Sequence, residues 1–122
     1  MALKVLIVDD DFINRKLLQT LLKKNPEVTD MSEAENGSDA LDKIKKDPTI
    51  NLILLDIMMP IVDGIEFLKI FRSDMNNAHI PVIVLSTDDT KKTEAFNNGA
   101  NDFLTKPIKE DRLFEKISQW SS

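Results

Sequence analysis

Short runs of apolar residues alternate along the chain with longer segments in which apolar residues recur every three or four positions. Residues 3–9, 52–56 and 82–85 are the clearest runs, and 102–105 is a shorter one. Runs of this kind are typical of strands that are buried on both faces, as in the middle of a parallel sheet. The segment 29–35 is weaker and more polar, so we expect it to form an edge strand.

The segments between these runs are predicted helices because their apolar residues have helical spacing. Ser38 is the expected N-cap of the second helix, and Asp63-Gly64 begins the third. Asp11 directly precedes the first helix, where its charge suits the positive end of the helix dipole. The remaining helices are expected at residues 12–24, 90–98 and 110–120.

Strand and helix alternate five times, which predicts a doubly wound α/β fold with a five-stranded parallel sheet between two layers of helices. The 122 residues have the size of one domain, and we expect residues 1–122 to form it with no output domain. The absence of cysteine, of a signal peptide and of a membrane-length apolar run favours a cytoplasmic protein without membrane contact. The net charge of −5 argues against direct nucleic-acid binding.

Each buried run ends in a polar side chain. Asp9 and Asp10 follow the first run, Asp56 ends the one at 52–56, and Ser86 and Lys106 follow the last two. Right-handed crossovers point all the strands the same way, so these groups should meet at one edge of the sheet. Crowded carboxylates repel unless a cation compensates them, and a few carboxylate oxygens suit Mg²⁺. A carboxylate nucleophile with a metal ion, a lysine and a hydroxyl is suited to phosphoryl transfer onto aspartate.

With these motifs the chain resembles the receiver domain of a two-component response regulator, of the CheY-like type. The resemblance implies a flavodoxin-like sheet in the order 2-1-3-4-5. It also implies a signalling switch rather than an enzyme, which takes a phosphoryl group from a histidine kinase or a histidine phosphotransfer protein and is read by a downstream protein. The matching motifs are Val8-Asp9-Asp10, Asp56 with Met59-Pro60 and Asp63-Gly64, Leu85-Ser86-Thr87, Gly99-Ala100, and Phe103 with Lys106-Pro107.

The resemblance assigns the acidic residues to the acceptor and to the metal. Asp56 is the implied phosphoacceptor. Asp10, Asp56 and the backbone carbonyl of Met58 are the implied direct ligands of Mg²⁺, for which Mn²⁺ could substitute, and Asp9 is expected to act through water. Met58 and Asp88 stand where the family tunes the hydrolysis of the phosphoryl group.

The remaining matching residues are expected to form the switch. Ser86 and Lys106 would bind the phosphoryl oxygens, and the Lys106-Pro107 peptide bond would be cis. When Ser86 moves towards the phosphoryl group, Phe103 would turn inward and change the face formed by helix 4, strand 5 and helix 5. Phe103 has no hydroxyl group, so packing alone must distinguish its rotamers.

Three other functions remain open on the residues alone. In a haloacid-dehalogenase-like phosphatase Asp9 would be the nucleophile, but the chain is short and Asp56 and Pro60 would have no role. An FMN-binding module is disfavoured because the acidic loop after the first strand would repel phosphate. The third alternative, a receiver-like scaffold that is never phosphorylated, leaves the complete set of site residues unexplained.

Overall fold

The computed structural model describes residues 2–57 and 63–121. Strands and helices alternate as the apolar pattern predicts. In that part of the chain, no helix combines the length and the apolar character that a bilayer crossing requires. In chain order the elements are β1 (Leu3–Val8), α1 (Phe12–Leu22), β2 (Val28–Ala34), α2 (Gly37–Lys46), β3 (Leu52–Asp56), α3 (Gly64–Ser73), the 3₁₀ turn η1 (Met75–Asn77), β4 (Val82–Ser86), the 3₁₀ turn η2 (Asp89–Lys91), α4 (Lys92–Asn97), β5 (Asp102–Thr105) and α5 (Glu110–Ser121).

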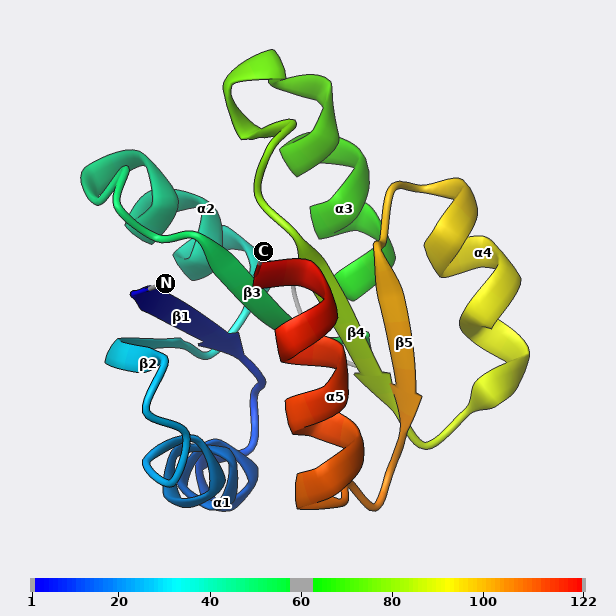
Figure 1. The fold of residues 1–122 in the computed structure, drawn as a ribbon. Coiled ribbons are helices and arrows are strands. Elements are labelled where there is room, and N and C mark those ends of the chain that lie inside the picture. The colour runs from blue at the N-terminus through cyan, green and yellow to red at the C-terminus, as the bar shows by residue number, and fades with distance from the viewer. Residues whose placement is uncertain (1, 58–62, 122) are drawn as a thin grey trace.

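The five strands form one parallel sheet in the order β2-β1-β3-β4-β5, which confirms the predicted fold class and strand order (Figure 1). β3 and β4 are buried along their whole length. β2 lies at an edge, and Ala34 is the one buried residue among its seven. The polarity of the second strand therefore reflects its edge position.

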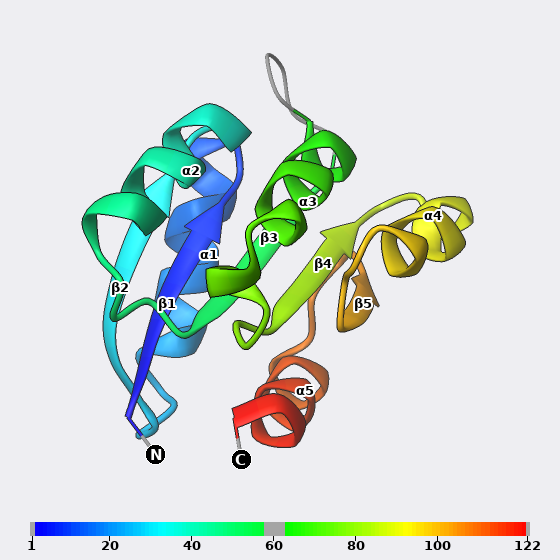
Figure 2. The ribbon, with the colours of Figure 1, turned by 90° about the horizontal axis from the view of Figure 1, so that it is seen from above.

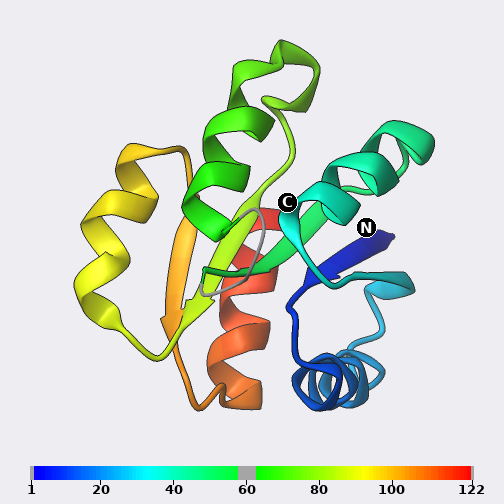
Figure 3. The same ribbon diagram turned by 180° about the vertical axis from the view of Figure 1, so that it is seen from behind.

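Alternate residues of each strand supply two separate hydrophobic cores, as the two-residue period of a strand requires. Leu6 and Val8 of β1 belong to the core beneath α2, α3 and α4, whereas Val5 and Ile7 belong to the core beneath α1 and α5. Figure 1 shows α5 in front of the sheet, and Figure 3 shows α2, α3 and α4 on the opposite side. The sheet is thus covered on both faces, and its carboxyl edge is left for polar side chains.

Three helices begin at a side chain that accepts hydrogen bonds from the first turn. Asp11 caps α1 and Asp63 caps α3, as the sequence predicts. The N-cap of α2 is Asn36, not Ser38, and its side chain accepts a 2.8 Å bond from the Asp39 backbone N–H. The prediction was wrong because Asn is as good a cap as Ser, so the helix starts at the earlier of the two.

The helix expected at residues 90–98 is shorter than predicted. Its first part is the 3₁₀ turn η2, because the Asp88 side chain accepts a hydrogen bond from the Thr90 N–H and closes a tight turn there. The α-helical part, α4, has only six residues. Gly99 ends it with φ of 105°, the left-handed conformation expected of a C-terminal glycine.

Arg72 connects the end of α3 to the segments that precede β4 and β5. Its guanidinium donates hydrogen bonds to the carbonyl oxygens of Gly99 (3.0 Å), Asn77 (2.8 Å) and Ile80 (2.8 Å), and to Oδ1 of Asn101 (2.7 Å). Asn101 Oδ1 also accepts from the Val82 N–H, and the Asn77 carbonyl also accepts from the Ile80 N–H, so Arg72 adds to bonds that already order this partly buried region. Arg72 therefore fixes the amino end of the sheet, opposite the acidic edge.

The end of α5 is held to the start of β5 by Asp102. Trp120 Nε1 donates a 2.9 Å hydrogen bond to Asp102 Oδ2, and Lys116 Nζ lies 3.2 Å from the same oxygen. Burial alone would raise the pKa of Asp102, but these bonds and the Phe103 N–H outweigh it and lower that pKa. Trp120 thus adds a hydrogen bond to the helix packing predicted for it.

Candidate functional site

The register of the sheet brings the acidic residues together. Val8 pairs with Leu55, so the next residue of each strand, Asp9 and Asp56, lie side by side at the carboxyl edge. Carboxylate oxygens of Asp9, Asp10 and Asp56 lie within 4.8 Å of one another. Asp9 and Asp56 are 1% and 7% exposed, whereas Asp10 is open to solvent. The three side chains predicted to share a metal ion therefore do converge.

Lys106 reaches this cluster from the end of β5. Its Nζ lies 3.5 Å from Asp9 Oδ2 and 3.8 Å from Asp56 Oδ2. Its backbone N–H donates a 2.8 Å bond to the Ser86 carbonyl, and its peptide bond to Pro107 is cis, as predicted. Within this group of four side chains one cation faces three carboxylates. The group therefore favours the binding of a further cation.

Asp9 shows where such a cation fits. Its Oδ1 accepts a 2.9 Å hydrogen bond from the Asp11 N–H. Its Oδ2 is buried and accepts no hydrogen bond within the described part of the chain; its ion-pair partner is Lys106. A buried carboxylate oxygen in that condition is costly unless a charge compensates it, and hard oxygen donors are the ligands that Mg²⁺ prefers. The residues present therefore fit the implied ion.

Ser86 lies beside this cluster at the end of β4, because Asp56 pairs with the preceding Leu85. The Ser86 side chain is fully buried, and its hydroxyl oxygen accepts a 3.0 Å bond from the Asp88 N–H. The Asp88 carboxylate accepts hydrogen bonds from the Thr90 hydroxyl and N–H, which lower its pKa. Both side chains are thus engaged with the loop that begins at Thr87.

Phe103 is already buried in this structure. It is 6% exposed and belongs to the core beneath α2, α3 and α4. The Phe103 ring therefore already lies in the core before phosphorylation, so the expected inward turn has no outward position to start from. A coupled movement of the ring would begin from this packed position. Met58, Met59 and Pro60, which the sequence associated with the metal and the acceptor, lie outside the described residues.

Two contacts near the site were not predicted from the sequence, although Gly64 itself belongs to the matching motif Asp63-Gly64. A Cβ atom on Gly64 would lie 2.8 Å from the Asp56 carbonyl oxygen, so this glycine lets α3 approach the acceptor strand. A glycine where a good helix former would be favoured is a detectable sign of such packing. Arg15 donates a 2.8 Å bond to the Asp9 carbonyl, and helical spacing alone gave no sign of that contact.

Comparison with known families identifies the domain that carries this site. The model of the response regulator receiver domain matches residues 5–118. The chain belongs to the response regulator receiver domain family. The receiver domain is the phosphoacceptor switch of two-component signalling, so the predicted class of function is confirmed. The match gives no support to the haloacid-dehalogenase-like alternative.

Individual relatives agree with the family assignment. This receiver domain is 37% identical to the chemotaxis protein CheY of Bacillus subtilis over 98% of each chain. The chemotaxis protein CheY4 of Vibrio cholerae has the same fold, with a TM-score of 0.87 at 29% identity and 98% coverage of both chains. The chain is also 35% identical to the response regulator PleD of Caulobacter vibrioides, of which it spans 26%.

Proposed function

We propose that Asp56 is the phosphoacceptor of this receiver domain and that phosphorylation of Asp56 switches the surface formed by α4, β5 and α5. The observation that carries the proposal is the convergence of Asp9, Asp10, Asp56 and Lys106 at one edge of the sheet. Asp56 is the favoured acceptor because it ends the fully buried strand β3, where a rigid backbone fixes the carboxylate.

The proposed reaction is an attack by a carboxylate on phosphorus. An oxygen of Asp56 forms a P–O bond while the P–N bond of a phosphohistidine donor breaks, and the electron pair of that bond returns to the imidazole nitrogen. The product is an acyl phosphate on the chain itself. Lys106, with Nζ 3.8 Å from Asp56 Oδ2, would pair with the transferred phosphoryl group. The Ser86 hydroxyl, which now donates to the Asp88 carbonyl and accepts from the Asp88 N–H, would leave these partners and donate to the phosphoryl group.

Asp10 and Asp56 would hold Mg²⁺ directly and Asp9 through water, with Mn²⁺ as a substitute ion. The Met58 carbonyl, the further proposed ligand, lies outside the described residues. When bound, the ion supplies positive charge that stabilises the oxygens of the transferring phosphoryl group. Met58 and Asp88 are proposed to control how fast the acyl phosphate is hydrolysed.

The proposed output begins at Ser86. Ser86 pairs with Thr105 across β4 and β5, so a movement of the β4 end is passed directly to β5. β5 lies between α4 and α5 (Figure 2), and Phe103 of β5 belongs to the same core cluster as Ala95 of α4. The phosphoryl group adds charge and strong acceptors that draw Ser86 inward. A downstream protein would read the resulting change in this face.

The direct test is to treat the protein with acetyl phosphate and measure its intact mass. We expect one phosphoryl group per chain in the presence of Mg²⁺ and none after chelation of the metal. Peptide mapping after reductive trapping of the acyl phosphate should place the label on Asp56. A folded protein that stays unlabelled, or one labelled on Asp9, would overturn the proposal.

A protein donor is expected to dock beside the acceptor on α1. Phe12, Ile13 and Leu17 are 57%, 62% and 60% exposed, unusually open for large apolar side chains. Leu17 also lines a pocket that Asp9 and Lys106 share. An apolar surface this close to the acceptor favours a partner that brings its phosphohistidine to Asp56.

Replacing Leu17 with Glu should therefore slow phosphoryl transfer from a phosphorylated histidine phosphotransfer protein by about tenfold or more, because an apolar contact is replaced by a charge. Labelling by acetyl phosphate should stay at the wild-type rate, and the free energy of unfolding should change by less than about 0.5 kcal/mol. Met75→Glu is the matched control, since Met75 is 88% exposed on η1 at the opposite edge of the sheet. Equal slowing with both phosphodonors would contradict a docking role.

A further inference from the structure

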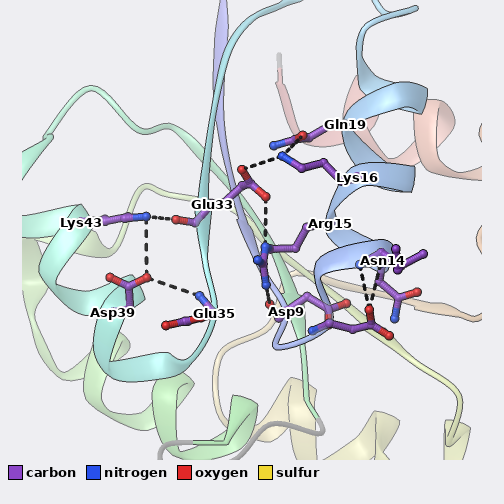
Figure 4. A network of polar contacts seen from close by, with 11 residues as sticks. Asp9, Asn14, Arg15, Lys16, Gln19, Glu33, Glu35, Asp39 and Lys43 are labelled. Carbon is purple, nitrogen blue, oxygen red and sulfur yellow. Dashed lines mark hydrogen bonds and ion pairs between the residues drawn. The ribbon is translucent and has the colours of Figure 1, made fainter.

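Arg15 of α1 joins the acidic loop to the edge strand. Its Nη1 donates a 2.8 Å hydrogen bond to the backbone carbonyl of Asp9, and its Nε donates a 3.0 Å bond to Glu33 Oε1 on β2. Figure 4 shows the guanidinium between these two residues. The Arg15 side chain is only 12% exposed, so most of it is ordered against neighbours. The planar guanidinium of α1 thus links the loop that follows β1 to β2.

Glu33 is a firm anchor for this bridge. It pairs with Ile7 in the sheet, and its carbonyl accepts a hydrogen bond from Lys43 on α2. Burial alone would raise the pKa of Glu33, but the bonds from Arg15, Gln19 and Lys16 outweigh it and lower that pKa. Glu33 therefore stays ionised at neutral pH and holds the Arg15 fork in place.

The bridge fixes Asp9 at its backbone. The Asp9 N–H donates to the Ala34 carbonyl at 3.0 Å, the Asp9 carbonyl accepts from Arg15, and Oδ1 accepts from the Asp11 N–H. The group left over is Oδ2, which faces Lys106. Because the Asp9 carbonyl and the Asp10 N–H belong to one planar peptide unit, the Arg15 bond also sets the direction in which Asp10 leaves the strand.

We infer that Arg15, held by Glu33, is a positioning residue for the metal-binding carboxylates Asp9 and Asp10. The inference rests on the proposed function and deepens it, because it names what orients the ligands. Arg15 does not touch the acceptor: it acts through the Asp9 peptide. Lysine cannot replace it, since a single ammonium lacks the planar fork that reaches Glu33 and the Asp9 carbonyl at once. Lys16 provides the contrast, because it bonds Glu33 at 3.2 Å but its hydrogen bonds do not reach the loop.

The test is to measure metal affinity without any phosphodonor, by titrating metal-free protein with Mn²⁺ and following free Mn²⁺ by electron paramagnetic resonance. Outer groups that orient metal ligands typically contribute about 10–100-fold to affinity. We therefore expect Arg15→Lys to raise the Kd for Mn²⁺ about tenfold. Lys16→Gln, which also loses a bond to Glu33, should change that Kd less than about twofold.

Two further measurements separate positioning from a general loss of structure. Glu33→Gln should weaken Mn²⁺ binding less than Arg15→Lys, and the double variant should lose less than the product of the two single effects because both act through one bridge. Labelling of Arg15→Lys by acetyl phosphate should need more Mg²⁺ but return towards the wild-type rate at saturation.

The outcomes distinguish this inference from the proposed function. Wild-type Mn²⁺ affinity in a folded Arg15→Lys variant would overturn the inference while leaving Asp56 as the acceptor. A loss of affinity equal to the unfolded fraction, measured by circular dichroism in the same solution, would also overturn it. Failure of the wild-type protein to be labelled or to bind the ion would instead reject the proposed function itself.

Discussion

Replacing Asp56 with Asn is expected to abolish labelling by acetyl phosphate and, at the same time, to stabilise the metal-free protein. The amide keeps the shape of the side chain and one acceptor oxygen but is not a nucleophile. Without metal, the Asp56 carboxylate faces two like charges and one lysine, all within a few ångströms. One such interaction over 4 Å amounts to about 4 kcal/mol at an effective dielectric constant of about 20. Removing two repulsions and one attraction, with Asp10 partly screened by solvent, should leave a net gain of about 1 kcal/mol.

Urea unfolding with and without Mg²⁺ checks this prediction alongside intact mass. Mg²⁺ should raise the stability of the wild-type protein, because binding to the folded state alone shifts the equilibrium, and should raise that of the variant much less. Asp42→Asn is the control: Asp42 is exposed on α2, and its loss should change neither labelling nor stability by more than about 0.5 kcal/mol. A variant that is still labelled would show that another residue is the nucleophile. A variant less stable than the wild-type protein would contradict the argued repulsion between Asp56 and its neighbouring carboxylates.

The fold and the site differ in how much of each could be predicted from the sequence. The order of strands and helices follows from apolar runs that are visible in the sequence. The polar residues that end those runs necessarily meet at one edge of a parallel sheet. The convergence of Asp9, Asp56 and Lys106 could therefore be predicted without coordinates. The strand order itself came from resemblance, because many orders satisfy the same pattern.

Contacts that depend on the choice between similar side chains could not be predicted. Asn36 and Ser38 are equally good caps, so residue type alone did not indicate which of them begins α2. Asp88 begins a 3₁₀ turn that helical periodicity cannot distinguish from the start of an α-helix. The Arg15 bridge joins residues 18 positions apart, Arg15 and Glu33, and depends on how α1 lies against β2. Such pairings arise from three-dimensional packing and leave no periodic trace in the sequence.

Replacing Gly64 with Ala is expected to lower the free energy of unfolding by about 2 kcal/mol, although alanine is the better helix former by up to about 1 kcal/mol. The added Cβ would lie 2.5 Å from the Ile57 Cα and 2.8 Å from the Asp56 carbonyl oxygen. Both are backbone atoms, so no rotamer change relieves the overlap, and α3 or the end of β3 must shift. Urea unfolding measures the loss, with Lys69→Ala, exposed on the same helix, as a control expected to be nearly neutral.

The Gly64→Ala variant also shows whether α3 or the end of β3 moves to accommodate the added Cβ atom. If α3 moves outward, the hydrogen bond from the Gly64 N–H to the Ile57 carbonyl, 2.9 Å in the native structure, weakens while Asp56 keeps its position. Labelling by acetyl phosphate would then be normal in the folded fraction. If the end of β3 moves, the Asp56 carboxylate is displaced relative to Lys106, and labelling should slow by more than the unfolded fraction explains. We expect slower labelling, because α3 is held by buried Phe67 and Phe71, whose rings stack 5.3 Å apart in the core. An unchanged free energy of unfolding would show that α3 does not pack against the acceptor strand as closely as the structure indicates.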